Sequence, residues 1–180
     1  MTRLIRRKHL LGCPASAGFA VAALAGLAFA PPMSAQEPAS WGNDLVFHTF
    51  SIAAVDPNTG ESGVAVTTRV ACVGNGVPWV RAGVGAVATQ ASTRTEYGQE
   101  LLDMLEQGMS PQEALDQATA ADDDRDRRQI GVVSLNGQAA QHTGSGPGEW
   151  AGHRSGQNYA TQGNVLVGPE VVDAVAEAFE

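Results

Sequence analysis

Short β segments joined by tight turns make up most of the sequence after residue 46, and they predict antiparallel sheets. Residues 47–70 form one hairpin pattern around a turn that contains Pro57, which presets φ, and Gly60, which accepts a positive φ. Residues 129–143 form a second hairpin around an Asn-Gly pair, the strongest short signal for such a turn. Apolar residues lie on both faces of the first hairpin, so we expect its sheet to be covered on both sides.

Two amphipathic helices are predicted between these hairpins, and a third near the end of the sequence. Tyr97, Leu101 and Leu105 share one helical face, and a glycine ends that helix. A capping box at 110–113 begins the next helix. The other expected elements are β segments at 77–80, 84–90 and 159–167 and a helix after Gly168. Consecutive strands joined by tight turns favour an α+β fold with antiparallel sheets over a doubly wound parallel sheet.

Three stretches predict no regular element and no special role. Residues 144–158 are rich in glycine and predict a loop, which carries His153 and Arg154. The acidic run 122–124 predicts a solvated loop, because carboxylates oppose the dipole at the end of the preceding helix. We expect Cys72 to be a small buried core residue rather than a nucleophile.

The N-terminus has the three parts of an export signal. Basic residues between positions 3 and 8 precede an uncharged apolar run at 10–30, and Ala35 is a small residue suited to cleavage. We therefore expect an exported protein, periplasmic or secreted, with a signal peptide at 1–35, a linker at 36–46 and a domain at 47–180. The apolar run is just long enough for an uncleaved membrane anchor, which is the alternative.

The last predicted helix is still amphipathic where the sequence ends. Val171, Val172, Val175 and Phe179 share one face of it, and no cap or tail follows. We therefore expect the domain to be truncated at Glu180, with further residues needed to complete the fold.

The chain is acidic, with eleven Lys and Arg against nineteen Asp and Glu and a formal net charge of −8. Such a chain gains neither counterion release on nucleic acid nor attraction to an anionic bilayer. We therefore expect no nucleic-acid partner and, once the signal is removed, no membrane partner. A small-molecule or peptide-like substrate fits better, and the apolar strands leave association into a homo-oligomer open.

Distinctive sequence blocks run through the domain. The first is HTFSIAAVDP at 48–57, and the longest is RAGVGAVATQA at 81–91. The others are GVAV at 63–66, VPW at 77–79, RQIGVV at 128–133, HTG at 142–144, WAGH at 150–153 and QGNVL at 162–166. In these blocks the chain resembles the bacterial family catalogued as domain of unknown function 1028, over nearly all of residues 48–180.

That family is similar to the N-terminal-nucleophile (Ntn) hydrolases, so the resemblance implies a four-layer αββα sandwich of two antiparallel sheets between helices. The nucleophile of such enzymes is the side chain at the mature N-terminus of the first strand, and the free α-amine is its base. By position, the resemblance implies Thr49 as the nucleophile and Ser51, on the same strand face, as the reserve. An α-amine with a pKa near ~7.7 can take the proton of a hydroxyl at neutral pH.

The resemblance also implies helpers around the nucleophile. Superfamily members place a basic residue beside it, which implies Arg81 in that role; a surface arginine at a turn is the alternative. Gln90 and Asn164 lie in apolar strands, where a buried amide can serve as an oxyanion donor or satisfy the backbone.

No cofactor and no metal are expected. His142 and His153 lack the spacing of a metal site, and the acidic run 122–126 lacks the glycine and terminal glutamate of a calcium loop. The glycines at 144–148 lack the lysine and the strand-to-helix setting of a phosphate-binding loop.

The resulting hypothesis is an exported hydrolase of amide bonds in a small or envelope-derived substrate. A free amine on Thr49 requires cleavage of the His48–Thr49 bond, because signal removal at residue 35 leaves about 13 extra residues. The alternative is a non-catalytic exported binding module with the same pocket, in which Thr49 and Ser51 are only strand formers.

Overall fold

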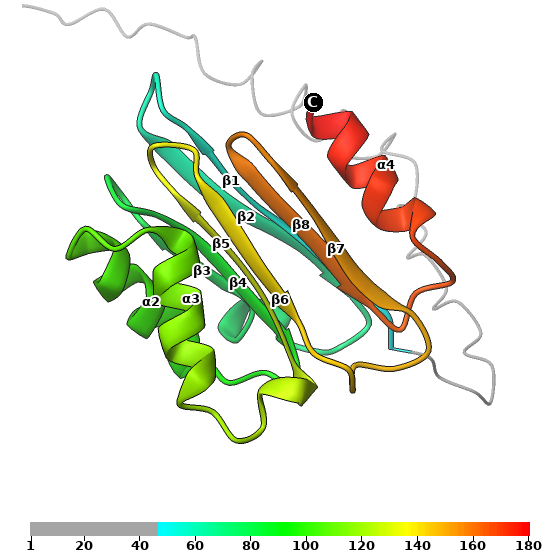
Figure 1. The fold of residues 1–180 in the computed structure, drawn as a ribbon. Coiled ribbons are helices and arrows are strands. Elements are labelled where there is room, and N and C mark those ends of the chain that lie inside the picture. The colour runs from blue at the N-terminus through cyan, green and yellow to red at the C-terminus, as the bar shows by residue number, and fades with distance from the viewer. Residues whose placement is uncertain (1–46) are drawn as a thin grey trace, which may run out of the picture. The chain divides into compact units, whose positions relative to one another are not determined.

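Eight strands in two antiparallel sheets form the centre of the fold in the computed structural model, which describes residues 47–180 (Figure 1). Each sheet has four strands, and three α-helices complete a mixed α+β arrangement in this part of the chain. The predicted α+β class with antiparallel sheets is therefore confirmed. The signal peptide predicted at 1–35 and the linker predicted at 36–46 lie outside the described residues.

The first sheet, with the strand order β2-β1-β8-β7, contains the predicted N-terminal hairpin. β1 (Thr49–Asp56) and β2 (Glu61–Thr68) pair antiparallel across the expected turn. β8 (Tyr159–Asn164) comes from the other end of the domain and pairs with β1, so that Thr49 lies opposite Asn164. Burial alternates along β1, because successive side chains of a strand point to opposite faces of the sheet.

The glycine-rich stretch 144–158 is not a loop throughout, and that prediction is wrong. β7 (Ala151–Gly156) lies within it and pairs with β8 across a tight turn, in which Asn158 has a φ of 74°. The ring of Tyr159 lies against Gly156, where a Cβ atom would clash with it. Packing against neighbouring rings stabilises this strand. Its small residues have a low intrinsic β propensity, so the sequence does not predict a strand here.

The second sheet, with the strand order β3-β4-β5-β6, contains the other predicted hairpins. Its strands are β3 (Pro78–Arg81), β4 (Gly85–Ala91), β5 (Arg128–Ser134) and β6 (Ala139–Thr143). The two central strands, β4 and β5, are almost wholly buried, as expected of continuous apolar runs.

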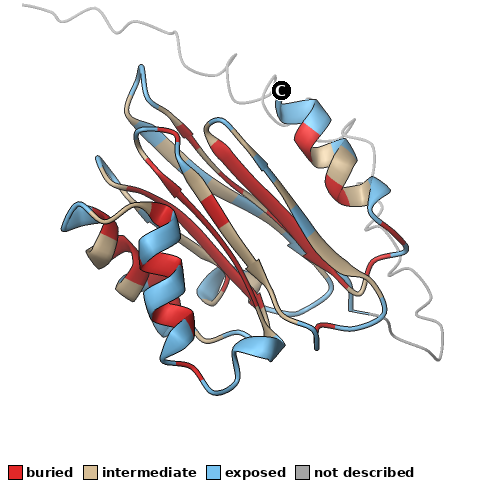
Figure 2. Ribbon diagram, viewed as in Figure 1, coloured by how far each residue is buried: buried red, intermediate tan, exposed pale blue. Residues whose placement is uncertain are grey.

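α2 (Glu96–Glu106) and α3 (Pro111–Ala120) cover the outer face of the second sheet (Figure 1). Leu101 and Leu115 pack with Ile130 in the core between the helices and the sheet. Figure 2 shows buried residues along the strands and on parts of both helices. The predicted capping box is present at the start of α3.

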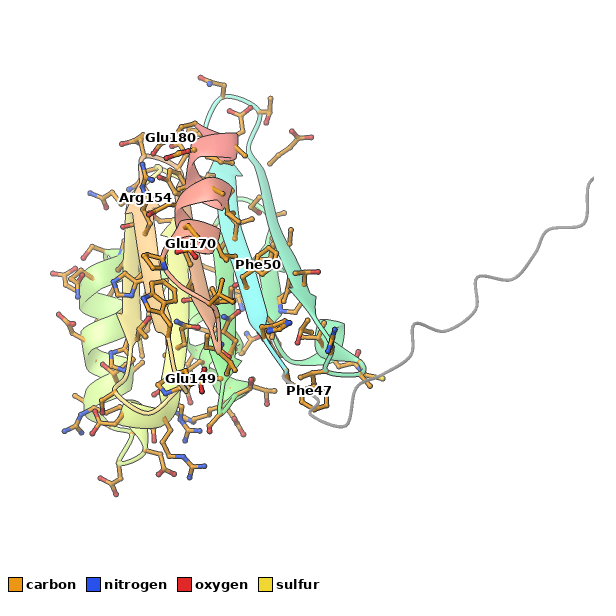
Figure 3. The ribbon with its side chains drawn as sticks, turned by 90° about the vertical axis from the view of Figure 1, so that its right-hand side faces the viewer. Phe47, Phe50, Glu149, Arg154, Glu170 and Glu180 are labelled. Atoms are coloured by element: carbon orange, nitrogen blue, oxygen red, sulfur yellow. The ribbon has the colours of Figure 1, made fainter. Side chains whose placement is uncertain are left out.

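α4 (Glu170–Phe179) lies on β7 and β8, and its Phe179 ring is 5.0 Å from the ring of Tyr159. β2 is an edge strand in which every second residue is exposed. Figure 3 shows Phe50 on the outer face of β1, beside α4. Within residues 47–180 the first sheet is thus covered on its outer face mainly over β7 and β8, which corrects the expectation of full cover on both sides.

None of the helices in residues 47–180 has the length and apolar character needed to cross a lipid bilayer.

Cys72 is exposed, so the prediction of a buried core residue is wrong. It precedes the 3-10 turn η1 (Val73–Asn75) and has a φ of 57°, in the left-handed region. The chain crosses here from the first sheet to the second, so no strand is present to bury the thiol.

Asp122 is buried, so the prediction of a solvated loop is wrong for this residue. Arg128 Nε and Tyr97 Oη each donate a hydrogen bond of 2.8 Å to Asp122 Oδ2. The hydrogen bonds from Arg128 hold the pKa of Asp122 well below its usual value, although burial opposes them; burial raises the pKa of Tyr97 to about 12. The turn η2 (Arg125–Arg127) brings the arginine back to the carboxylate, which neutralises it.

Replacement of Asp122 by asparagine is expected to lower the free energy of unfolding by about 3 kcal/mol at pH 7, because Arg128 loses its buried partner. The native carboxylate has a lowered pKa, so its contribution is complete above the unfolded pKa and declines as pH falls below about 4. Urea unfolding between pH 3 and 7 should show the difference between wild type and variant shrinking on the acid side. Asp123→Asn, at an exposed neighbour, should change stability by less than about 0.5 kcal/mol. A constant difference across this range would contradict the assignment.

Candidate functional site

A cavity of about 320 Å³ lies where β1 begins, at the end of the domain where the two sheets meet. Thr49 of β1, Gln90 of β4 and Asn164 of β8 all line it. Three of the five predicted site residues are therefore brought together from three strands and from both sheets. Phe47, which also lines the cavity, lies where the described chain begins (Figure 3).

Thr49 is the first residue of β1, which is paired on both sides, and its side chain forms a hydrogen bond to β2. Its exposure is only 7%, although it lines the cavity. Its Oγ1 is 2.9 Å from Oγ1 of Thr68 on β2, and Asn164 faces it across the ladder with β8. This arrangement presents a hydroxyl to the cavity in a defined position.

The amides of Gln90 and Asn164 converge on a shared acceptor. Gln90 Nε2 and Asn164 Nδ2 donate to Oε1 of Gln129 on β5, at 2.8 and 2.9 Å. Each of these amide nitrogens carries a second N–H, because a carboxamide has two donors. The shared acceptor therefore holds the two amides side by side, and both residues line the cavity.

Gln129 was not singled out in the sequence, and it connects the two amides. Its Nε2 has two N–H groups, which are shared among three acceptors: the backbone oxygens of Gly163 at 2.8 Å and Gly152 at 3.1 Å, and Thr143 Oγ1 at 3.0 Å. The side chain is fully buried, where an unsatisfied amide would be unfavourable. In the sequence, Gln129 is one amide at the start of an apolar strand. Its partners can be identified only from the structure, in which both sheets are assembled.

Ser51 is buried behind the cavity and supports Gln90. Its Oγ donates to Gln90 Oε1 at 2.7 Å, a bond that connects the first sheet to the second. The cavity lining includes Thr49 but not Ser51. Of the two predicted hydroxyls, the one at the start of the strand is therefore the one that a bound molecule can meet.

The backbone is strained directly after both amide residues. Ala91 follows Gln90 with a φ of 69°, and Val165 follows Asn164 with a φ of 54°. Left-handed backbone is rare outside glycine, and for a β-branched residue it is an outlier. Both strained residues line the cavity. Strain of this kind collects at functional sites, where the surrounding structure enforces it.

Arg81 lies apart from this cluster, so its expected position beside Thr49 is corrected. It pairs with Gly85 at one end of β4, whereas Gln90 lies five residues further on, roughly 16 Å along the strand. Its guanidinium donates to Asp103 at 2.7 Å and to Glu106 at 2.8 Å, and the hydrogen bond with Asp103 raises the pKa of Arg81. The structure therefore favours the alternative, a surface arginine at a turn.

The cavity lining is uncharged throughout the described part of the chain. Its polar members are the site residues Thr49, Gln90 and Asn164 together with Ser92 and Thr93. Across residues 47–180 no group of three or more His, Cys, Asp or Glu side chains is arranged to hold a metal ion.

Comparisons with known proteins identify a family and a similar solved structure. The family model described as a family of unknown function, DUF1028, matches residues 49–180. The crystal structure of protein SPO2555 from Silicibacter pomeroyi, which carries the same family description, is similar to this chain with a TM-score of 0.71 and 37% sequence identity. The similarity covers 73% of this chain and 61% of that one, so the chain spans less than two thirds of that protein's length. No curated protein matches the chain.

Proposed function

Because the chain belongs to the family of unknown function DUF1028, we propose that it is an exported Ntn-type hydrolase that cleaves amide bonds in a small or envelope-derived substrate. One observation carries the proposal: the Thr49 hydroxyl begins β1 inside a cavity that the amides of Gln90 and Asn164 also line. The family match begins at the same residue, which supports a functional start there.

The chemistry requires a free α-amine on Thr49. In the proposed reaction this amine takes the Oγ1 proton while Oγ1 attacks the carbonyl carbon of the substrate. The carbonyl electron pair moves to oxygen, and the free N–H groups of Gln90 and Asn164 stabilise the resulting oxyanion. The amine then passes its proton to the leaving nitrogen as the C–N bond breaks. Water hydrolyses the acyl ester, which releases a carboxylic acid and restores the hydroxyl.

The arrangement of sheets and helices is compatible with a four-layer αββα sandwich of the Ntn type. Helices α2 and α3 lie outside one sheet and α4 lies outside the other, with both inner faces packed together.

Purified exported protein is expected to begin at Thr49. After the signal peptide is removed, attack of Thr49 Oγ1 on the His48 carbonyl and hydrolysis of the resulting ester would free the amine. Intact-mass measurement and Edman degradation distinguish this product from one that begins near Gln36. Thr49→Ala should stay uncut after His48, whereas Thr67→Ala, on the outer face of β2, should be cut normally. An active protein that still begins near Gln36 would refute the mechanism.

The alternative is an exported binding module that uses the same cavity without catalysis. The contact of Phe47 with the cavity favours it, because the uncut chain keeps this residue at the site. The two functions differ in one measurable respect, since only the enzyme turns over amides.

A further inference from the structure

We propose that the cavity at Thr49 selects neutral amides with a compact, uncharged aliphatic acyl group, an inference that rests on the amide hydrolysis proposed above. The cavity lining combines two kinds of side chain. The hydroxyl and the two amides suit the reacting carboxamide. The apolar members include Val70, Val73, Val77, Pro147 and Val165.

Because the described lining has no charged side chain, binding of a charged acyl group is unfavourable. A carboxylate or ammonium group placed against these valines would lose its water and gain no partner, which costs several kcal/mol. Two arginines close to the lining are already engaged. Arg94, next to Thr93, donates to Glu100 at 2.6 Å, and Arg128 is paired with Asp122.

The size of the cavity gives a scale for the acyl group. At about 30 Å³ for each water-sized unit, the volume of about 320 Å³ in the uncut chain holds on the order of ten non-hydrogen atoms, and loss of Phe47 from the lining after cleavage opens the cavity further. A short chain such as hexanoyl therefore fits beside Thr49, with the leaving group directed outward.

Two p-nitroanilides that differ mainly in charge test this selectivity on the full exported protein. Hexanoyl-p-nitroanilide has an apolar acyl chain, and 5-carboxypentanoyl-p-nitroanilide has a carboxylate in place of the terminal methyl group. We expect kcat/KM to favour the hexanoyl compound by about 100-fold or more, because the carboxylate has no partner in the cavity.

A variant that introduces a charge tests whether the preference for the hexanoyl compound arises at this cavity. Val70 lines it and is 48% exposed, so Val70→Lys should fold and should lower the hexanoyl preference by about fivefold. Val80→Lys is the matched control, since Val80 is 50% exposed on β3 and lies outside this lining. An unchanged preference in Val70→Lys would overturn the proposed location.

The remaining outcomes separate this inference from the proposed function. Equal or faster turnover of the carboxylated compound would overturn the proposed substrate class but leave amide hydrolysis intact. Arg69, next to Val70, would then be the next residue to test. Turnover of neither compound would overturn the hydrolase. Binding of hexanamide and of adipic acid monoamide, followed by saturation-transfer NMR, would then decide the class. Preference for hexanamide supports an uncharged ligand, and equal binding rejects it.

Discussion

Replacement of Thr49 by alanine is expected to lower kcat for amide hydrolysis by about 10⁴-fold while the domain remains folded. The hydroxyl is the only reactive group of the proposed mechanism that lines the cavity, and Ser51 is buried behind it. The fold should survive, because the side chain makes one hydrogen bond, to Thr68, whose hydroxyl is partly accessible. Burst-phase and steady-state assays with hexanoyl-p-nitroanilide, together with thermal unfolding, measure both quantities.

Two further variants distinguish loss of the nucleophile from a general disturbance. Thr49→Ser keeps a hydroxyl at the same place and should retain measurable turnover. Thr67→Ala removes a threonine from the outer face of the neighbouring strand and should have the activity of wild type. If Thr49→Ala kept more than a tenth of the wild-type kcat, another residue would have to be the nucleophile.

Replacement of Gln129 by methionine is expected to lower kcat by about 100-fold and the free energy of unfolding by about 3 kcal/mol or more. The variant keeps the size of the side chain but removes the oxygen that accepts from both Gln90 and Asn164. It also removes the donor to Gly163, whose carbonyl is then left without this bond. The two amides lose their common orientation, so stabilisation of the oxyanion should decline more than substrate binding does.

Gln162 on β8 provides the matched control for this variant. It is equally buried, but within residues 47–180 its Nε2 donates to the Ala88 carbonyl, at 2.9 Å, and forms no hydrogen bond with either amide. Gln162→Met should lower stability by about 1 to 3 kcal/mol and leave kcat near the wild-type value. A positioning role predicts that kcat falls while KM changes little in Gln129→Met alone. Equal effects of the two variants on kcat would assign Gln129 a purely structural role.

Local sequence signals predicted most of the elements, because each depends on neighbours in the chain. The turn at Gly60 and the capping box before α3 act over four or five residues, and both are present in the structure. The errors occurred where burial depends on side-chain packing and pairing that local propensity does not describe. β7 is stabilised by ring packing, and Asp122 is neutralised by an arginine on the next strand.

The candidate site shows the same division. Thr49 could be named from the resemblance to the family, and Gln90 and Asn164 could be named as amides in apolar strands. Their convergence could not be derived, since it depends on β1 pairing with β8 and on the second sheet packing against the first. Gln129 was missed for this reason, because it lies where the amides of β4 and β8 converge. Arg81 was misplaced because it lies at the end of β4 opposite to Gln90.

The sequence by itself therefore determined the strands, turns and helices of the domain and the kinds of side chain available for chemistry. Only the tertiary structure decided which of those side chains share a cavity and which are buried with a partner. The hydrogen bond from Thr161 to the backbone of Ser51 joins residues 110 positions apart. Periodicity and turn preference act over a few residues, whereas contacts of this kind depend on how whole sheets pack.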